Sequence, residues 1–559
     1  MHKVNFYKFW WNEHLDALKC NAIALFRTWS ELGKPRVGDA FEAMMKSKRE
    51  YKQGIKMAEL NSRECFTNRL TDALLEKDID TFWSSWRAKF LKNKRSSTID
   101  GSSDDGVIAS KFASIFQSVY NPNNPEKHGK WEKTFKELFA NYNEPDVIVD
   151  ENCIQLCIQQ LKKGKAAGYD GLTAENIMFA HPILCHYLCI LFKCMLKHLV
   201  VPGGFGCGVI IPLLKNLDGD KTDIRNYRGI TLSPVISKLF EIVCMRKLGD
   251  KLVSDNLQFG FKQKSSCSNA LFTLSCVVKY CCAHGSTVSL CALDISKAFD
   301  KVDQFALLVQ MLKRRFPKCI VGVMEHWFSI STCSVRWGSS VSVSFKVCAG
   351  VRQGGLISPG FFALYINDLI LRLRSSKLGC IIGTEYLGCL LYADDILLLS
   401  HSVNVLQQML NICKSFAEEF DIVFNCEKSF AMRIGERYDA VCSELVLSDV
   451  NIKWVQQVKY LGINLVAGKT LSCCFNHLKL KFYKMFNCIY SKCKDDSACV
   501  VIELMKYYCL PIITYALESI PVRKSQLKMF DNCINRVIGK TFNVWDAENI
   551  RCIKSVLNM

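Results

Sequence analysis

The stretch of sequence that decides the fold is GCLLYADDILLLS, residues 388–400. Two apolar runs flank the polar residues Asp394 and Asp395, and this pattern predicts a β-hairpin. Burying an unpaired carboxylate in so apolar a hairpin is costly, so these side chains need cations or hydrogen-bond donors. A solvated turn tip, where Asp is a favoured residue, explains the Asp-Asp pair equally well.

A second acidic position decides between these explanations. Asp294 ends the apolar run 289–293, where a predicted strand (288–296) gives way to a helix. If this strand pairs with the hairpin, Asp294 and Asp394 can face each other. Carboxylates in that arrangement hold two divalent ions about 4 Å apart, which suits in-line phosphoryl transfer. Because clustered carboxylates repel one another without metal, the sequence predicts Mg²⁺ here.

Phosphate groups also need fixed cations outside the metals. Lys215 ends the apolar run VIIPLLK, and Arg228 lies in NYRGI (226–230). Both precede the carboxylate strand, and a flexible Lys together with a forked Arg suits a triphosphate. Taken singly, each is better explained as an ordinary surface charge.

Composition limits the class of protein. The chain has 559 residues, of which 49% are hydrophobic and 22% charged, so collagen-like and wholly disordered chains are excluded. Its 72 basic and 53 acidic residues give a net charge of +19, which favours nucleic acid as a partner. The N-terminus lacks the apolar core of a signal peptide, and no run is long enough to span a bilayer. We therefore expect an intracellular protein with no membrane partner.

The 30 cysteines do not indicate a disulfide scaffold. Such scaffolds are normally short secreted chains, and no Cys-x-x-Cys pair occurs, so we expect reduced thiols. His181, Cys185 and Cys189 could line one helix face as metal ligands. Burial in the core is the favoured interpretation, because free cysteines are among the most buried residues.

Residues 1–140 are predicted to form a helical N-terminal extension. Apolar and aromatic residues recur there at helical spacing, namely Phe6, Trp10, Leu15, Leu18, Phe82, Trp86 and Phe90. Its middle is basic with interleaved Phe41 and Tyr51, a mix that could hold a template RNA. A solvated helix face explains that mix about as well. Helical and strand-like runs alternate over 141–467 and helical patterns dominate 468–559, so the predicted fold class is α+β.

Seven stretches, in the right order, resemble motifs of reverse transcriptases. DISKAFD (294–300), GVRQGGLISP (350–359) and YADD (392–395) look like motifs A, B and C of these enzymes. KKGKAAGYDGLTAENI (162–177) and NYRGITLSP (226–234) narrow the resemblance to non-LTR (LINE-type) retrotransposons. NCEK (425–428) and KYLG (459–462) look like the later palm motif and the primer grip.

The resemblance implies a right-hand polymerase. Fingers and a palm with an antiparallel sheet would occupy residues 141–467, and a helical thumb would occupy 468–559. The implied activity is that of an RNA-directed DNA polymerase, which extends a DNA 3′-OH on an RNA template with dNTPs. Two Mg²⁺ ions would serve the nucleotidyl transfer, with Mn²⁺ able to substitute.

The resemblance also implies metal-binding roles. Asp294, Asp394 and Asp395 would be the catalytic metal carboxylates, with Asp395 expected to play the supporting part. The backbone carbonyl of Ile295 would face the same ions.

Nucleotide and primer contacts follow from the same resemblance. Lys215 and Arg228 would bind the triphosphate, and Gln353 and Gly354 would contact the incoming nucleotide and the template base. The primer grip would be Tyr460, Leu461 and Gly462. Lys428 is a candidate proton donor to the leaving pyrophosphate. Phe299 would leave no room for a 2′-OH, whereas a mere core Phe predicts no sugar selectivity.

Complete elements of this type usually carry an endonuclease and often a Cys/His zinc knuckle, and neither pattern is found in this sequence. We expect the endonuclease to be supplied elsewhere and the enzyme to act in the nucleus, where its chromosomal target lies. The alternative is a decayed or repurposed copy that only binds nucleic acid. A group II intron maturase is a weaker alternative.

Overall fold

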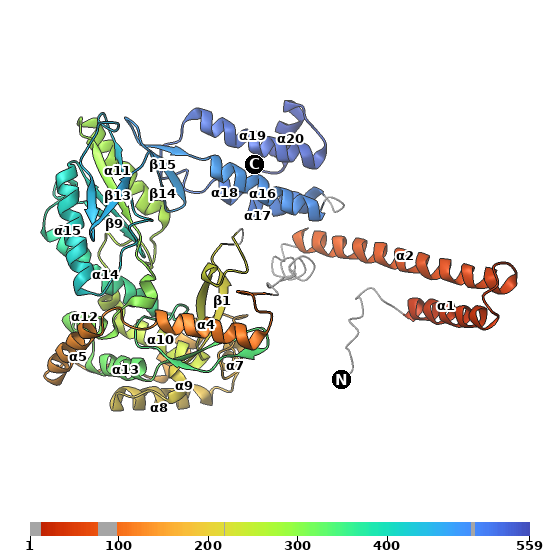
Figure 1. The fold of residues 1–559 in the computed structure, drawn as a ribbon, viewed down its shortest axis with the longest axis horizontal. Coiled ribbons are helices and arrows are strands. Elements are labelled where there is room, and N and C mark those ends of the chain that lie inside the picture. The colour runs from red at the N-terminus through yellow and green to blue at the C-terminus, as the bar shows by residue number, and fades with distance from the viewer. Residues whose placement is uncertain (1–12, 76–97, 217–218, 494–497) are drawn as a thin grey trace. The chain divides into compact units, whose positions relative to one another are not determined.

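The structure is a computed structural model, and it describes residues 13–75, 98–216, 219–493 and 498–559 (Figure 1). The chain divides into two compact units. The sheet unit comprises Arg95–Phe475 and Ala516–Arg523, and the helical unit comprises Met1–Lys94, Asn476–Tyr515 and Lys524–Met559. Helices and several sheets make up the described residues, so the predicted α+β class is confirmed.

The predicted hairpin lies in a six-stranded sheet of the sheet unit, in the order β12-β13-β11-β3-β10-β9. The strands are β3 (Val288–Leu293), β9 (Cys389–Tyr392), β10 (Asp395–Ser400), β11 (Phe430–Ile434), β12 (Leu445–Leu447) and β13 (Val450–Trp454). β9 and β10 pair antiparallel, which confirms the hairpin. β10 also pairs antiparallel with β3, so the predicted strand and the hairpin share one sheet.

This sheet is mixed, so the prediction of an antiparallel palm sheet was wrong in one respect. β11 runs parallel to β13, with Phe430 beside Lys453. The chain leaves β11, passes through β12 and turns back into β13, which is antiparallel to β12. The β12–β13 hairpin therefore docks on β11 with its second strand, which runs in the same direction as β11.

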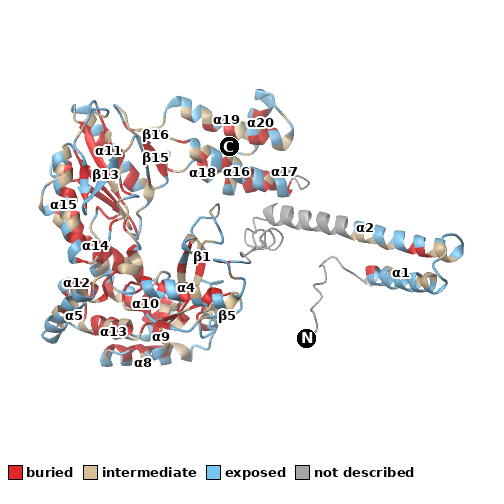
Figure 2. Cartoon of the chain, viewed as in Figure 1, coloured by how far each residue is buried: buried red, intermediate tan, exposed pale blue. Residues whose placement is uncertain are grey.

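Two helices pack on this sheet, α11 (Cys267–Ala283) and α15 (Val403–Glu419), and α14 (Ser358–Ser375) packs on α15. α15 buries Leu406, Met409, Leu410 and Cys413, whose spacing places them on one helix face. Strands β3, β9 and β10 are buried along most of their length, and Figure 2 shows much of this sheet as buried. The continuous apolar runs of β9 and β10 are thus explained by burial on both faces.

A second sheet of the sheet unit consists of β1 (Cys207–Leu214), β2 (Tyr227–Leu232), β4 (Thr332–Trp337), β5 (Ser340–Val341) and β6 (Phe345–Lys346). Helix α4 (Asp105–Val119) covers it. The ring of Phe112 stacks on Trp337 at 5.3 Å and meets Tyr227 edge-on at 5.2 Å. This aromatic cluster fixes β2, which carries Arg228 and pairs with β1, and Lys215 directly follows β1.

The remaining helices of the sheet unit are α5 (Pro125–Ala140), α6 (Glu151–Gln159), α7 (Ala174–Met178), α8 (Ile183–His198), α9 (Gly203–Gly206), α10 (Val235–Leu248), α12 (Gln304–Lys313) and α13 (Lys318–Ser329). Cys189 of α8 is buried, and its thiol donates to the Val149 carbonyl. His181 lies before α8, where its Nδ1 accepts from the Ile183 N–H at 3.2 Å. Core burial, the favoured interpretation, fits Cys189, whereas Cys185 is only partly buried and His181 is exposed.

Smaller strands complete the sheet unit: β7 (Ile381–Ile382), β8 (Glu385–Tyr386), β14 (Gln457–Tyr460), β15 (Ile463–Val466) and β16 (Ser472–Cys474). β7 pairs with β8, and β14, β15 and β16 form a three-stranded sheet.

The helical unit contains α1 (Glu13–Glu31), α2 (Asp39–Leu75), α16 (Asn476–Cys493), α17 (Ala498–Tyr508), α18 (Leu510–Ile513), α19 (Lys524–Phe542) and α20 (Ala547–Val556). Helix was predicted in both of these parts of the chain. The predicted apolar positions Phe6, Trp10, Phe82, Trp86 and Phe90 lie outside the described residues. Among the helices that the structure describes, none combines the length and apolar character needed to cross a membrane.

Candidate active site

The turn of the β9–β10 hairpin places two acidic side chains at one end of the large sheet. Tyr392 pairs with Asp395, so Ala393 and Asp394 form a two-residue loop. Ala393 has a φ of 56°. A positive φ at the first loop residue is what a tight hairpin turn of this length requires, although it is uncommon for residues other than Gly. Asp394 thus lies in the turn itself, and Asp395 begins β10.

The register of β3 brings the third carboxylate to the same end of the sheet. Leu293 pairs with Ile396, so Asp294, the residue directly after β3, lies beside Asp395 of the neighbouring strand. The negative charge of Asp394 raises the pKa of Asp294, although burial contributes more. The predicted approach of Asp294 to the hairpin carboxylates is therefore present in the structure.

The three carboxyl groups carry poorly compensated charge. Burial, together with the negative charges of Asp394 and Asp294, raises the pKa of Asp395 to about 6. Burial also raises the pKa of Asp394. Within the described part of the chain, no salt bridge joins any of the three to a basic side chain. Lys428 lies close enough to Asp294 to lower its pKa, which partly offsets the effect of burial. Carboxylate oxygens suit hard divalent cations, so these residues fit Mg²⁺.

Backbone contacts fix the end of β3. The Asp294 N–H donates to Ser429 Oγ at 3.2 Å, and the Asp294 carbonyl accepts from the Asn425 N–H at 2.8 Å. Ile295, predicted to present its carbonyl to the metals, is buried and forms an antiparallel bridge with Phe424. The backbone hydrogen bonds of this bridge are made by the residues on either side of Ile295. The Ile295 carbonyl therefore takes no part in them.

Gln258, which the sequence analysis missed, holds the acidic turn. It is 0% exposed, and its Oε1 accepts from the Ala393 N–H at 3.0 Å and from the Gly260 N–H at 2.9 Å. Its Nε2 donates to the Ala393 carbonyl at 3.3 Å. The only available sequence signal was Gly260, two residues after Gln258, since a Gly inside an apolar segment often marks a close backbone approach.

Basic side chains gather beside this end of the sheet. Burial lowers the pKa of Lys215, and the positive charges of Lys428, Lys297 and Arg228 lower it further. Arg228 of β2 pairs with Leu213 of β1, which lies two residues before Lys215. The predicted triphosphate residues and the candidate proton donor are thus near one another. Lys297, which was not predicted, joins them, and its place between Asp294 and Phe299 was the available sequence signal.

Phe299 is clamped between two other aromatic rings. It stacks on Phe362 at 4.9 Å and meets Phe261 edge-on at 5.6 Å. Its carbonyl accepts from the Val351 N–H at 2.8 Å, which ties it to the loop that contains Gln353. The ring is half-buried and has a defined orientation.

The loop with Gln353 and Gly354 packs closely on β2. The Gln353 carbonyl accepts from the Thr231 N–H at 2.7 Å. Gly354 has a φ of 116°, and a Cβ there would lie 2.6 Å from the Thr231 carbonyl oxygen. Only Gly fits this position, because both the backbone conformation and the close approach exclude a side chain.

Asp300 is a third residue that the prediction did not assign. Its carboxylate accepts from Gln353 Nε2 at 2.7 Å and also bonds to the Tyr120 hydroxyl. Burial raises the pKa of Asp300 to about 6, although these hydrogen bonds and nearby lysines oppose the shift. Asp300 therefore fixes the orientation of the Gln353 amide.

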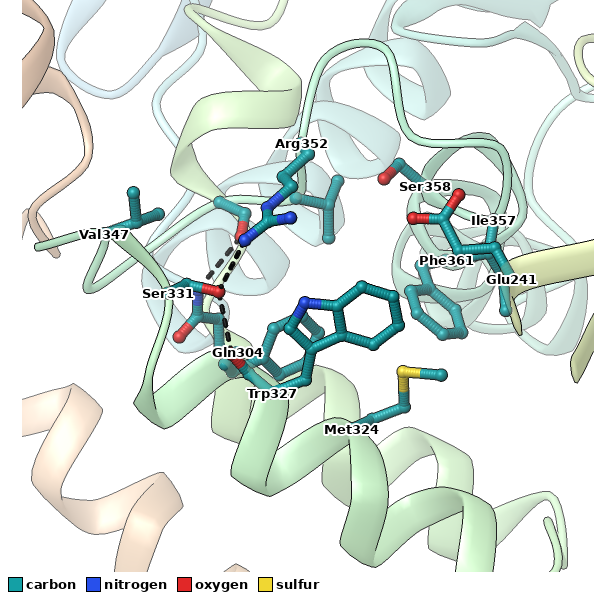
Figure 3. A pocket seen from close by; sticks show the side chains of 13 residues that line it. Glu241, Gln304, Met324, Trp327, Ser331, Val347, Arg352, Ile357, Ser358 and Phe361 are labelled. Carbon is teal, nitrogen blue, oxygen red and sulfur yellow. Dashed lines mark hydrogen bonds between the residues drawn. The ribbon is translucent and has the colours of Figure 1, made fainter. Parts of the chain in front are cut away.

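Arg352 anchors the other side of the same loop. Its guanidinium donates to Ser331 Oγ at 3.2 Å and to the Phe205 carbonyl at 2.9 Å, and it lies over the ring of Trp327 (Figure 3). The fully buried Glu241 accepts from the Leu356 N–H. Both charged side chains bind protein groups, so their role is to hold the loop.

The predicted primer grip is a tight turn. Tyr460 pairs with Ile463, and the two loop residues Leu461 and Gly462 have φ values of 43° and 82°. Two positive φ angles define the mirror-image turn that hairpins favour. Burial raises the pKa of Tyr460, and the charge of Asp395 adds to the shift, so this turn lies near the carboxylates.

Comparisons with known proteins agree with this arrangement. The profile of the family described as "Reverse transcriptase (RNA-dependent DNA polymerase)" matches residues 219–465, which include most of the residues above. The chain is 26% identical over 432 residues to the "RNA-directed DNA polymerase from mobile element jockey" of Drosophila melanogaster, covering 73% of this chain and 45% of that protein.

Two further relatives come from the same organism. The "Retrovirus-related Pol polyprotein from type-2 retrotransposable element R2DM" is 24% identical over 257 residues, which is 44% of this chain and 24% of that protein. The "Putative 115 kDa protein in type-1 retrotransposable element R1DM" is 25% identical over 322 residues, which is 56% of this chain and 30% of that protein. The chain spans less than half the length of each of these three proteins. Residues 219–465 therefore form a reverse transcriptase domain, related to the reverse transcriptases of non-LTR retrotransposons.

Proposed function

We propose that this chain is an RNA-directed DNA polymerase of a non-LTR retrotransposon, which extends a DNA 3′-OH on an RNA template. The observation that carries the proposal is the meeting of Asp294, Asp394 and Asp395 at one end of the sheet. Polymerisation needs both acidic metal ligands and basic phosphate ligands, and the cluster around Lys215 supplies the second kind.

In this proposal the three carboxylates and the Ile295 carbonyl hold two Mg²⁺ ions, for which Mn²⁺ can substitute. When bound, the ions supply activation of the 3′-hydroxyl and neutralise the charge that develops on the leaving pyrophosphate. The carboxylates must be ionised to bind, so their raised pKa values are expected to set the acid limit of activity.

The remaining residues bind and orient the substrates. Lys215 and Arg228 hold the triphosphate of the incoming dNTP, and Lys428 donates a proton to pyrophosphate as it leaves. The Gln353 amide, oriented by Asp300, packs with Gly354 against the new base pair.

The turn Tyr460-Leu461-Gly462 supports the primer end. We assign residues 141–467 to fingers and palm and residues 468–559 to a helical thumb. The N-terminal helices are proposed to contribute to template binding, and the nicked chromosomal primer places the action in the nucleus.

Primer extension tests the activity. The full chain is expected to incorporate dTTP on poly(rA)/oligo(dT) with Mg²⁺, and Asp394→Asn should lower the rate by roughly a thousandfold or more, because one metal ligand loses its charge. The matched control is Asp439→Asn, which changes an exposed Asp of the same unit and should keep the wild-type rate.

The alternative function, nucleic-acid binding without catalysis, predicts a different result. Wild type would then bind the duplex and incorporate no nucleotide, and Asp294→Ala would leave binding unchanged. Any metal-dependent extension that disappears in Asp394→Asn but not in Asp439→Asn contradicts this alternative.

Phe299 is proposed to select the sugar. Its ring is held by Phe362 and Phe261 and would occupy the space that a 2′-OH needs. Phe299→Val should raise rNTP incorporation relative to dNTP by about tenfold or more, since a small side chain removes the steric block. An unchanged ratio would mean that the ring serves only the core.

A further inference from the structure

A cluster of soft metal ligands lies outside the carboxylate site. Cys281 is in the last turn of α11, Cys380 lies between α14 and β7, and His401 follows β10. One ligand atom from each of these residues lies within 4.8 Å of the other two, and in the described part of the chain they are the one group of three such ligands that is so close. Cys380 Sγ is 3.7 Å from His401 Nδ1, and Cys281 shares hydrogen bonds with both residues.

Main-chain contacts hold Cys380 in place. The Cys380 N–H donates to the Leu399 carbonyl at 3.0 Å, and the Cys380 carbonyl accepts from the Leu387 N–H at 2.9 Å. The preceding Gly379 has a φ of 107°, and a Cβ there would lie 2.8 Å from the Leu399 carbonyl oxygen. The thiol is therefore fixed against the end of β10, next to His401.

The other cysteine is also anchored. The Cys281 carbonyl accepts from the Ser286 N–H at 2.9 Å, which closes the end of α11. Both cysteines are buried, whereas His401 is exposed. The cluster thus forms a preorganised set of ligands at the protein surface, with one side open to solvent.

We propose that Cys281, Cys380 and His401 bind one Zn²⁺ ion. Two thiolates and one imidazole are ligands that Zn²⁺ prefers, whereas Mg²⁺ prefers oxygen. Three protein ligands leave a fourth tetrahedral position, which water reaches on the exposed side of His401. The ion would join α11, the segment before β7 and the end of β10.

This site is separate from the proposed catalytic site. Asp395 begins β10 and His401 follows its last residue, so the two lie at opposite ends of the strand, roughly 20 Å apart at 3.3 Å per residue. The zinc would therefore not take part in nucleotidyl transfer. Its effect would be on stability, because an ion that binds only the folded state stabilises it.

Titration with Co²⁺ alone tests the proposal on the full, reduced chain. Wild type should bind one Co²⁺ with a thiolate-to-cobalt charge-transfer band, which the Asp294, Asp394 and Asp395 carboxylates cannot produce. His401→Ala should weaken this binding at least tenfold, and Cys380→Ser should remove most of the band. The matched control is Cys276→Ser, an exposed cysteine of the same helix, which should behave as wild type.

Thermal unfolding supplies a second measurement. Zn²⁺ should raise the melting temperature of wild type and Cys276→Ser but not of His401→Ala, whose exposed side chain can be removed without disturbing the core. Equal cobalt bands in all variants, or no thiolate band in wild type, would overturn the proposal. A disulfide between Cys281 and Cys380 in protein purified with reductant would overturn it as well.

Discussion

Gln258 shows how an uncharged residue can control a charged turn. Its buried amide satisfies both backbone groups of Ala393, the residue directly before Asp394. Ala393 adopts a positive φ, which costs about 1 kcal/mol or more for a residue with a side chain. The hydrogen bonds from Gln258 offset this strain and keep the carboxylates at the end of the sheet.

Replacing Gln258 should therefore affect both stability and rate. Gln258→Leu leaves the buried N–H groups of Ala393 and Gly260 without an acceptor, which should cost about 1–3 kcal/mol of the free energy of unfolding. Displacement of Asp394 should also lower kcat for primer extension by about tenfold or more. The control is Gln263→Leu at an exposed position nearby. Equal melting temperatures and rates for the two variants would contradict this role.

Asp300 provides a pH-dependent test. Its pKa is about 6 in the folded chain and near 3.9 in an unfolded one, so at pH 5 only the folded state holds the proton. This proton uptake stabilises the fold at low pH, and the stabilisation is lost as pH rises through about 6. Asp300→Asn keeps an acceptor for Gln353 and carries no charge at any pH.

Between pH 5 and pH 7.5, wild type should therefore lose about 1–2 kcal/mol of its free energy of unfolding relative to Asp300→Asn. Chemical denaturation at the two pH values measures it. Asp439→Asn, at an exposed position, should show no such shift. The assignment fails if both variants respond to pH alike.

At the scale of elements, the acidic hairpin depends on a neighbouring segment. Residues 257–260 lie along β9, where the Phe259 N–H donates to the Leu391 carbonyl at 2.8 Å and the Leu391 N–H donates to the Leu257 carbonyl at 2.8 Å. A Cβ on Gly260 would collide with the backbone nitrogen of Ala393. The absence of a side chain at Gly260 allows this segment to reach the turn.

Gly260→Ala should push the segment away from the hairpin. We expect a loss of about 1–3 kcal/mol in stability, because the collision is with backbone and cannot be relieved by a rotamer change, and a fall in the extension rate. Gly129→Ala is a control that should change stability in the opposite direction. It lies inside α5 with open space around it, so it should stabilise the chain by roughly 0.5–1 kcal/mol. Thermal denaturation and primer extension of both variants check these outcomes.

At the scale of the whole molecule, the net charge of +19 governs binding to nucleic acid. Phosphate contacts release counterions, so affinity for an RNA–DNA duplex should fall steeply with salt, by about a thousandfold between 50 and 200 mM for six contacts. Fluorescence anisotropy with a labelled duplex measures this slope. Asp394→Asn should show the same slope as wild type, because the basic side chains are unchanged. A salt-independent affinity would argue against a phosphate-binding channel.

The sequence by itself determined which segments form helices and strands and which residues carry the charges of the site. Local patterns of apolar and polar residues specified the β9–β10 hairpin, the β3 strand and the helices, because side-chain period and turn chemistry are local properties. They also placed Asp294 and the Asp394–Asp395 pair at strand ends. The parallel pairing of β11 with β13 was not predictable in this way, since it depends on how the β12–β13 hairpin docks.

Only the tertiary structure revealed the contacts between residues that lie far apart in the sequence. Gln258 meets Ala393 over 135 positions, and Gln353 meets Asp300 over 53. Cys281, Cys380 and His401 come together from three elements, so no spacing motif could mark them. Such contacts arise when the core forms and brings distant backbones together, and a linear pattern contains no information on that approach.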